Sequence, residues 1–421
     1  MSKTLQATGL GPLADGGRVV VIGGGPGGSG AALALQAEAR RLGREIQITV
    51  VEGKQLEEGK HHNLCSGVLS PPIMTLVENE LGVPFPKHLC GACVTGYVLH
   101  ANQQQIILDG ESEPSAAMRR ILFDAYLLQT ARQRGIEVHT ARATGVEFHA
   151  DRVVVYTENS PLTADVVVGA FGLDEGTGAL FQQAVGYRPP PALSAIVTKY
   201  HPGKEGMQAF GKRIHAFLPR SQHIEFGGIT PKEDHLTINI AGVAVNTDLM
   251  DGFLATPMVR DALPAFENAG RFKPLDLRYF KGRFPCGLAR HYTGDRFVMV
   301  GDAAGLVRAF KGKGVTSAIQ TSLRAARVIL REGISAEAFR AYHAANQDIT
   351  RDLPFGRAMR FLTITAARLG LMGVVIRAAE HDAGLQRALF DAVSAHQSYT
   401  HVVRGALTAH AAKAILGALF K

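Results

Sequence analysis

The sequence predicts a mixed α/β protein with a Rossmann-like domain split along the chain, an antiparallel β-sheet lobe and a helical C-terminal region. Three observations support this fold class. A strand, glycine turn, helix and strand follow one another within 18–53, apolar residues alternate with period two through much of 176–285, and a strand, glycine turn and helix return at 295–333. The 421 residues are too many for one compact core and suit several lobes.

The composition is that of a globular chain rich in glycine. Hydrophobic residues make up 46% and charged residues 19%, and there are 47 glycines, where average usage gives roughly 30. The net charge of +8 suits nucleic acid, a membrane surface or an anionic cofactor. Basic residues accompany glycine turns in 271–331 and do not alternate with aromatic residues. A phosphate-bearing ligand is therefore favoured, and no nucleic acid is expected.

The two ends of the chain bear on location. Residues 1–17 have no apolar core of signal-peptide type, and no uncharged apolar run reaches the ~18 residues that a membrane-spanning helix needs. A cytoplasmic protein is expected. The last segment, "VVRGALTAHAAKAILGALFK", has apolar residues at helical spacing with basic residues between them. Such a helix packs on a second lobe or lies on an anionic membrane, so peripheral contact with the inner membrane through the C-terminal helices is a second expectation.

The first glycine turn has the pattern of a dinucleotide site. Gly23, Gly25 and Gly28 form G-x-G-x-x-G, which follows a predicted strand and opens a predicted helix. Gly23 allows the tight turn, Gly25 lets the backbone approach a pyrophosphate, and Gly28 lets the helix lie close to the strand. Glu52 ends the second strand, where its carboxylate can accept hydrogen bonds from ribose hydroxyls. The pattern alone does not choose between NAD, NADP and FAD.

The remaining elements follow in chain order. Residues 119–134 predict a helix that stops at Gly135, 135–157 and 164–172 predict strands, and the tail from 334 is helical by pattern. A dinucleotide-binding domain is predicted in two parts, 18–175, with an embedded segment 60–115, and 286–333. The antiparallel substrate lobe, 176–285, lies between them, and a helical region, 334–421, ends the chain.

A second glycine cluster, "GDAAGLVRAFKGKG" at 301–314, follows a strand and opens a helix. Asp302 can accept a hydrogen bond from a cofactor hydroxyl, and the turn before the helix offers backbone N–H groups to an anion or an electron-rich carbonyl. "GGGPGGSGAA", "GDAAG" and the "GKG" turn resemble the FAD-dependent oxidoreductases with the para-hydroxybenzoate hydroxylase fold over most of 18–330. "LCSGVLSP", "RRILFDAYLLQTA", "RFPCGL" and "IEFGGITPKEDHLTINIAG" are most similar to the geranylgeranyl reductase group.

The resemblance implies FAD as the cofactor and further contacts to it. Arg120 would reach the cofactor or form a surface salt bridge, and Asp302 would contact the ribityl chain or the pyrophosphate. Lys311 and Lys313 would raise the positive potential near the flavin or point to solvent. The implied cofactor residues are, in full, Gly23, Gly25, Pro26, Gly28, Glu52, Arg120, Gly301, Asp302, Gly312, Lys313 and Gly314.

The activity implied is hydride transfer through flavin N5, which reduces or dehydrogenates carbon–carbon bonds of a hydrophobic, isoprenoid or lipid-like substrate. Gly228 and Thr230 stand where prenyl reductases carry Trp and Phe, and Phe171 stands where many flavin hydroxylases carry Asp. A flavin-dependent monooxygenase or halogenase, and an electron-transfer flavoprotein serving a quinone or protein partner, remain alternatives. Without a second G-x-G-x-x-G, NAD(P)H is expected only as a transient electron donor, with a redox protein or a quinone as alternatives.

Cysteine is too sparse for a disulfide framework, and no metal is expected. Cys90 and Cys93 precede a predicted strand, so packing is favoured over a redox dithiol, which is activated at a helix N-terminus. The resemblance places Cys65 near the isoalloxazine, where a thiol can donate a proton to a substrate carbon after hydride transfer. The adjacent His61 and His62 either tune that thiol or lie in a solvent-exposed loop.

Overall fold

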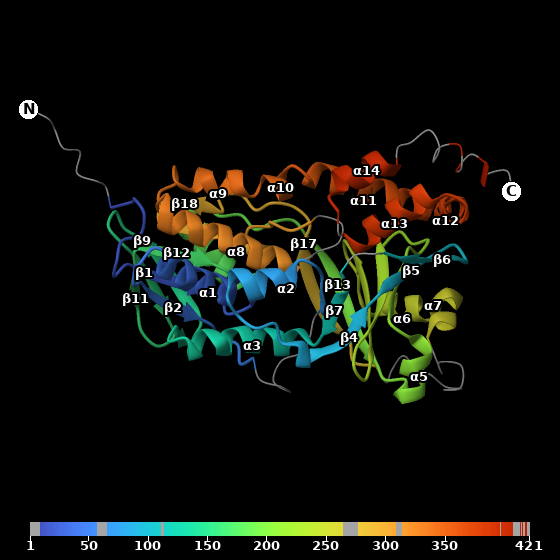
Figure 1. Ribbon diagram of the computed structural model, residues 1–421, viewed down its shortest axis with the longest axis horizontal. Helices are drawn as coiled ribbons and strands as arrows, with labels where there is room; N and C mark the ends of the chain where they lie inside the picture. The colour runs from blue at the N-terminus through green and yellow to red at the C-terminus, as the bar shows by residue number, and fades with distance from the viewer. Residues whose placement is uncertain are drawn as a thin grey trace, which may run out of the picture.

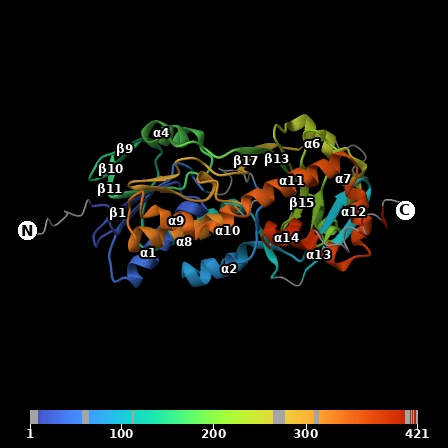
Figure 2. The same ribbon diagram turned by 90° about the horizontal axis from the view of Figure 1, so that it is seen from above.

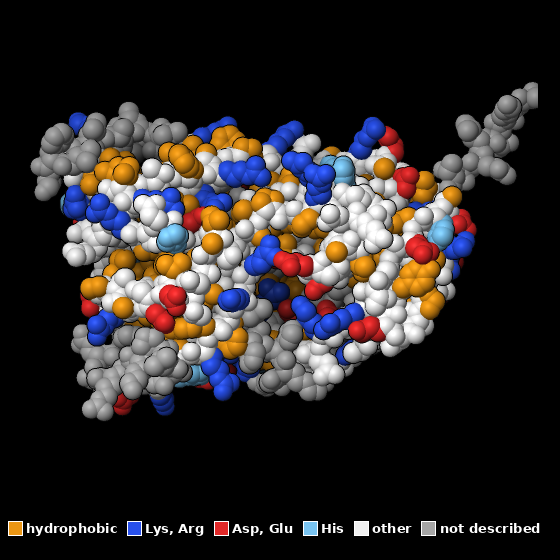
Figure 3. Space-filling view, turned by 180° about the vertical axis from the view of Figure 1, so that it is seen from behind, with side chains coloured by type: hydrophobic (Ala, Val, Ile, Leu, Met, Phe, Trp, Pro, Cys, Tyr) orange, Lys and Arg blue, Asp and Glu red, His pale blue; other side chains and the backbone are white. Residues whose placement is uncertain are grey.

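The structure is a computed structural model of the chain. It describes 9–56, 65–110, 113–263, 277–308, 314–395 and 397–406, with single positions 413, 415, 417 and 418 beyond them. The molecule is elongated, with an α/β half on the left of Figure 1 and a sheet-rich half on the right. Lys and Arg side chains are spread over the back of both halves in Figure 3, so the net positive charge does not gather in one patch on that face.

A six-stranded sheet forms the centre of the α/β half. Five of its strands pair in parallel and one edge strand is antiparallel. The sheet order is β18 (Thr293–Gly294), β19 (Phe297–Met299), β12 (Val166–Gly169), β1 (Arg18–Ile22), β2 (Gln47–Val51) and β8 (Glu137–His139). Numbered along the chain, the parallel strands run 3-2-1-4-5, which is the order of a doubly wound dinucleotide-binding sheet. The order reverses between β1 and β12, and a crevice outside the carboxyl ends of the strands is expected at such a point.

Two helices cover this sheet side by side, α1 (Pro26–Arg41) and α8 (Gly314–Arg331). The Ser322 hydroxyl on α8 donates to the Gly27 carbonyl oxygen on α1 at 2.8 Å. That close approach depends on small residues in both helices. The half is completed by α3 (Arg120–Gln133), α4 (Glu175–Val185) and a three-stranded sheet of β9 (Ala143–Phe148), β10 (Val153–Thr157) and β11 (Leu162–Ala164).

The sheet-rich half is built on seven strands. Their order is β17 (Phe280–Pro285), β13 (Ala192–Tyr200), β16 (Leu236–Gly242), β15 (Phe226–Pro231), β14 (Arg213–Phe217), β5 (Gly96–Ala101) and β6 (Gln104–Asp109). The predicted antiparallel pairing is confirmed from β17 to β14. At β14 the sheet continues in parallel with β5, which comes from a much earlier part of the chain. Alternation in the sequence shows that a segment is a strand but not which strand lies beside it.

Three helices interrupt this half, α5 (Gly203–Phe210), α6 (Thr247–Leu254) and α7 (Pro257–Ala262). The period-two pattern did not predict them. The N-terminus of α6 is capped by Asn246, whose side-chain oxygen accepts from the Leu249 N–H at 2.9 Å. From α6, Phe253 packs edge-on against Phe217 of β14, with ring centroids 5.5 Å apart. The helix is therefore held by burial on the sheet.

A small three-stranded sheet joins the halves. It consists of β3 (Val68–Leu69), β7 (Ser115–Met118) and β4 (Cys90–Val94). The short helix α2 (Ile73–Thr75) follows β3 along the chain. Because β7 leads directly into α3, its last residues lie at the boundary between the two large sheets.

The helical tail is confirmed in the part that the structure describes. Its helices are α9 (Phe339–Ala345), α10 (Gln347–Thr350), α11 (Leu353–Arg368), α12 (Met372–Ala379), α13 (Ala383–Ser394) and α14 (Tyr399–Ala406). Figure 2 shows α9, α10 and α11 in succession from the α/β half to the sheet-rich half. The Asp352 carboxylate accepts from the backbone N–H groups of Tyr399 and Thr400, each at 2.9 Å, and so ties α11 to α14.

Candidate functional site

The glycine turn after β1 needs glycine for two steric reasons. Gly23 has φ +106°, and a Cβ there would lie 2.5 Å from the Ala170 carbonyl oxygen. A Cβ on Gly28 would lie 1.6 Å from the Gly23 oxygen. Gly25 differs, because a Cβ on it would meet nothing within 4 Å. Gly25 is the N-cap of α1, which begins at Pro26. The backbone is therefore open at Gly25, directly in front of the positive end of the helix dipole, whereas the first turn of α1 behind it is buried.

Glu52 lies beside this turn. One oxygen of its carboxylate accepts from the Gly24 N–H at 2.7 Å, and the other accepts from the Lys54 N–H at 2.7 Å. Each carboxylate oxygen has two lone pairs, so both keep an acceptor position after these bonds. The structure thus fixes the acid at the end of β2, next to the open side of the glycine turn.

The second glycine cluster lies after β19. Gly301 has φ +58°, and its N–H donates to the Thr321 hydroxyl of α8 at 3.0 Å. A Cβ on Gly314 would lie 3.6 Å from an oxygen of Asp302, so the carboxylate lies near the first residue of α8. Burial raises the pKa of Asp302, and the charge of Arg120 opposes that rise. Gly312, Lys313 and the other predicted lysine, Lys311, lie outside the described residues.

Arg120 brings α3 into this group. Its guanidinium forms a two-pronged pair with Asp124, at 2.7 and 3.2 Å, and keeps 22% of its side chain exposed. Burial acts to lower the pKa of Arg120, but the facing Asp124, Cys65 and Asp302 outweigh it and hold the pKa above its ordinary value. Arg120 thus makes a salt bridge, and its charge also interacts with Cys65 and Asp302. Its contact with the cofactor stays a prediction.

Cys65 sits at the end of a loop that is fastened to β7. Its sulfur accepts a long hydrogen bond from the Gly67 N–H at 3.3 Å, and the Gly67 carbonyl accepts from the Met118 N–H at 3.0 Å. Gly67 has φ +72°, and a Cβ there would lie 2.1 Å from the Met118 oxygen. Cys65 is half-buried. The neighbouring His61 and His62 lie outside the residues that the structure describes.

Lys232 is the functional candidate that the sequence did not predict. It follows β15, is 3% exposed, and places its ammonium 2.8 Å from the position of a Cβ on Gly67. Burial lowers the pKa of Lys232 to about 8; Cys65 opposes this, while Lys199, Arg119 and Arg120 add to it. A lysine that directly follows the predicted strand in "GGITPKEDH" was the available signal, but it stands in a polar turn with Glu233, Asp234 and His235, where a lysine is ordinary. Nothing in that stretch indicates that Cys65 lies opposite.

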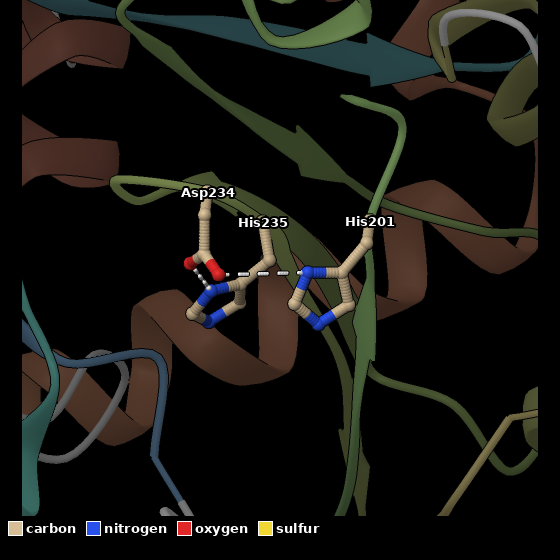
Figure 4. A group of neighbouring side chains, drawn as sticks. All are labelled: His201, Asp234 and His235. Carbon is tan, nitrogen blue, oxygen red and sulfur yellow. Dashed lines mark hydrogen bonds and ion pairs between the residues drawn. The ribbon is translucent and has the colours of Figure 1, made fainter. Parts of the chain in front are cut away.

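The turn after Lys232 carries a second polar group, drawn in Figure 4. The Asp234 carboxylate accepts from Nδ1 of His235 at 2.7 Å and faces Nδ1 of His201 at 3.7 Å. Burial lowers the pKa of His235 to about 4, so its ring is neutral. Its Nε2 is buried and has no hydrogen-bond partner among the described residues. These three side chains are spaced closely enough for a metal ion and include no cysteine.

Near Lys232, the face of the seven-stranded sheet carries mostly small and polar side chains. Lys199, Thr237 and Thr230 are direct neighbours across β13, β16 and β15, and Asn239 lies opposite Gly228 in a parallel row. Thr230 and Thr237 are 2% and 1% exposed, and the Thr237 hydroxyl has no hydrogen-bond partner within the described chain. The positions where prenyl reductases carry two aromatic rings are thus occupied by a surface with little side-chain volume and several polar atoms.

Two further residues, Arg308 and Phe171, have structural contacts. Arg308 donates to the carbonyl oxygens of Ala395 and Gln397, both at 2.6 Å, and so fastens the second glycine cluster to the end of α13. Phe171 stacks on Phe181 with ring centroids 5.5 Å apart, which makes it a packing residue.

The C-x-x-C pair lies within a strand. Cys90 and Cys93 both belong to β4, with Cys90 half-buried and Cys93 exposed. Burial, together with the Cys93 thiol, raises the pKa of Cys90. A raised pKa disfavours the thiolate that redox exchange requires. The half-burial of Cys90 fits the packing role that the sequence favoured, whereas Cys93 is exposed and its role stays a prediction.

Solved structures share this fold over nearly the whole chain, although no protein-family model and no curated protein sequence matches it. A geranylgeranyl bacteriochlorophyll reductase-like protein from Thermoplasma acidophilum is 18% identical, with 96% of each chain covered and a TM-score of 0.64. A flavoprotein/dehydrogenase from Cytophaga hutchinsonii is 17% identical, with 95% of this chain and 98% of that chain covered and a TM-score of 0.67. A flavin-dependent brominase is 15% identical, covers 92% and 97%, and has a TM-score of 0.62. The fold implied by the resemblance is confirmed.

Proposed function

We propose that the chain is an FAD-dependent oxidoreductase that reduces or dehydrogenates carbon–carbon bonds of a hydrophobic substrate. One observation carries the proposal. Four elements from separate segments meet at one edge of the sheet. The glycine turn, Glu52 and Asp302 follow the carboxyl ends of β1, β2 and β19, and Arg120 on α3 faces Asp302. That is where a doubly wound sheet binds a dinucleotide, and the fold is one shared with solved flavoproteins.

The residues fit FAD in charge and in space. The open side of Gly25 and the N-terminus of α1 suit a pyrophosphate. The free lone pairs of Glu52 suit ribose hydroxyls, and Asp302 would accept from a hydroxyl of the ribityl chain. Arg120 adds a guanidinium that faces Asp302, and the N-terminal end of α8 lies beside that carboxylate.

Bound flavin would supply hydride transfer at N5. The chain's own contribution begins with Cys65, whose thiol would give a proton to a substrate carbon. Arg120 and Lys232 both act electrostatically on this sulfur. Their two positive charges would stabilise negative charge that develops on the substrate next to Cys65.

The polar face of the sheet supports a further statement about the substrate. Lys199, Thr237 and Thr230 form one cross-strand row close to Lys232. The Thr237 hydroxyl has no partner in the described chain, so a polar substrate group that reached it would gain a hydrogen bond that a wholly apolar chain could not make. We therefore propose a substrate that combines an apolar part with a polar or anionic end held by this row.

A flavin-dependent monooxygenase or halogenase is the second candidate, because the flavin-dependent brominase shares the fold over 92% of this chain. An electron-transfer flavoprotein is the third. NAD(P)H, a redox protein or a quinone would serve as the electron source or sink. Rapid NAD(P)H oxidation with release of hydrogen peroxide would favour the monooxygenase. Reduced flavin that is stable in air would favour a reductase or an electron carrier.

The test is flavin binding with a matched pair of glycine variants. Gly25→Ala adds a methyl group into open space beside the proposed pyrophosphate, so it should fold normally and bind FAD at least tenfold more weakly. Gly252→Ala adds the same methyl group into open space on α6 and should leave FAD affinity unchanged. FAD affinity is measured by quenching of flavin fluorescence. A well-folded wild-type protein that takes up no flavin on reconstitution would refute the proposal.

A further inference from the structure

More than half of the exposed large hydrophobic side chains of the described chain gather in one stretch of the helical region. Eight such residues are exposed in the described chain, and five of them lie within 355–371. These five form what we call the α11–α12 patch: Phe355, Phe361, Leu362, Leu369 and Leu371, with exposed fractions of 41, 68, 64, 63 and 43%. Single exposed hydrophobic residues are ordinary, but a gathered group marks a surface that meets another molecule or a membrane.

The patch follows from the spacing of residues on α11. Phe355, Leu362 and Leu369 are seven positions apart, which is close to two helical turns, so they lie on one side of the helix. The other side is packed against the protein, since Leu353 is 4% and Ala367 is 2% exposed. The helix α11 is therefore packed along one side and carries exposed apolar side chains along the other.

Two arginines hold α11 in this orientation. Arg360 donates to both carboxylate oxygens of Glu225, at 2.6 and 2.5 Å. Arg368 donates to the carbonyl oxygens of Ser221 and Gln222, at 3.1 and 2.7 Å. Both contacts fasten the helix to the loop before β15. In Figure 1, α11 lies at the top of the sheet-rich half, on the outside of the molecule.

Cations outnumber acids along the patch. No Asp or Glu occurs from 353 to 379, whereas four arginines do, of which Arg360 is paired with Glu225; the exposed Glu380 follows directly. Arg357 is exposed on α11 itself, and Arg351 is exposed just before it. A symmetric contact with a second copy would bring these cations toward the same cations of the other molecule. Anionic lipid headgroups would instead neutralise them while the apolar side chains enter the interfacial region.

The shape of this segment suits a surface contact. No single helix in the described residues is long and apolar enough to cross a membrane, but Gln347–Arg368 and Met372–Ala379 together reach the length and composition of a span and are bent by 103°. The bend places Leu369 and Leu371 at a corner. A corner with exposed leucines can enter one leaflet without crossing the bilayer.

We propose that the α11–α12 patch docks this protein on the surface of an anionic lipid bilayer, with Phe361, Leu362 and Leu369 in the interfacial region and Arg351 and Arg357 on lipid phosphates. This inference does not depend on the flavin. It names a surface for the peripheral membrane contact that the sequence led us to expect through the C-terminal helices; most of the last twenty residues, whose spacing first suggested that contact, lie outside the described chain.

The test is sedimentation of the full chain with large unilamellar vesicles. The vesicles contain phosphatidylcholine with either about a third phosphatidylglycerol or none. Wild-type protein should bind the anionic vesicles at least tenfold more tightly than the neutral ones, and raised salt should weaken that binding. A double variant that carries both Phe361→Gln and Leu362→Gln should bind the anionic vesicles at least tenfold more weakly than wild type. Both side chains are mostly exposed, so they contribute chiefly to the lipid contact.

A matched control removes an exposed aromatic ring elsewhere. Tyr156→Gln changes a 38% exposed residue on β10, at the opposite end of the molecule in Figure 2, and should bind vesicles like wild type. Thermal unfolding checks that the double variant and the control fold like wild type. Absence of vesicle binding by wild type, or equal loss in the control, would overturn the proposal. So would a wild-type dimer in sedimentation velocity that Phe361→Gln separates, because the patch would then be an interface between copies.

Discussion

The ammonium of Lys232 lies 2.8 Å from the place that a Cβ on Gly67 would occupy, two residues after Cys65. This contact joins the end of β15 in the seven-stranded sheet to the loop that enters β3. It is one of the places where the two halves of the molecule meet around the candidate site.

Gly67→Ala should destabilise the protein by about 2–4 kcal/mol, through left-handed strain and overlap with neighbouring atoms. The added methyl group would lie 2.1 Å from the Met118 carbonyl oxygen, which cannot rotate away as a side chain can. Gly43→Ala is the control, since Gly43 has a similar φ of +64° and open space around it. Its cost should be the strain alone, about 1–2 kcal/mol. Urea unfolding measures both, and equal losses would contradict the proposed close contact.

Lys232→Met should change how stability depends on pH. In the folded protein burial lowers the pKa of Lys232 from 10.5 to about 8. Below about pH 8 the lysine is protonated in both states, and the folded state bears the full cost of the buried charge. Between about pH 8 and 10.5 the unfolded chain holds a proton that the folded protein lacks, so the free energy of unfolding of wild type rises with pH.

The Lys232→Met variant has no buried charge at this position. The excess of its free energy of unfolding over that of wild type should be largest below pH 8 and should shrink by about 3 kcal/mol by pH 10.5. Denaturant unfolding of both proteins in the absence of cofactor, at several pH values, measures the difference. Parallel curves for the two proteins would mean that the pKa of Lys232 is not lowered.

Cys65→Ala should reduce kcat about 100-fold with little change in KM, if the thiol supplies a proton in the reaction. Cys93→Ala is the control, because Cys93 is exposed on β4 and should leave turnover unchanged. Cofactor absorbance should be the same in all three proteins, which separates loss of proton transfer from loss of flavin. Full turnover by Cys65→Ala would assign the thiol a lining role only.

Arg360→Met should destabilise the protein by about 3–5 kcal/mol, because it leaves the Glu225 carboxylate buried without its partner. The side chains of this pair are 20% and 5% exposed. The pair Arg340–Glu337 is the control, with exposed fractions of 77% and 72%, and Arg340→Met should change stability by no more than about 0.5 kcal/mol. Thermal unfolding compares the two, and similar losses would show that burial does not set the strength of the Arg360 pair.

Much of the fold could be predicted because its signals are local. The run "RVVVIGGGPGGSG" fixes a buried strand, a turn that only glycine allows and a helix start, since each depends on neighbouring residues. The same holds for the helix beginning at Arg120 and for the alternating strands of the middle lobe. Glu52 beside the glycine turn followed from strand length, because β2 runs parallel to β1 and both end at one edge.

Other features were decided only by tertiary structure. Which strands lie next to each other, such as β5 beside β14, depends on contacts between distant segments that periodicity does not encode. The unusual properties of Lys232 and Thr237 also depend on contacts between distant segments. A lysine in a turn and a threonine in a strand are ordinary until other segments bury them, and burial then lowers the pKa of Lys232 and leaves the Thr237 hydroxyl without a partner in the described chain.

The sequence by itself determined the dinucleotide turn, the helix and strand types and the identity of the candidate thiol, because these depend on residues close together in the chain. Tertiary structure alone decided that Arg120 faces Cys65 and Asp302, that Lys232 touches the loop at Gly67, and that α11 presents phenylalanine and leucine outward. Burial and electrostatic interaction depend on distance in space, and the linear order of residues does not contain that distance.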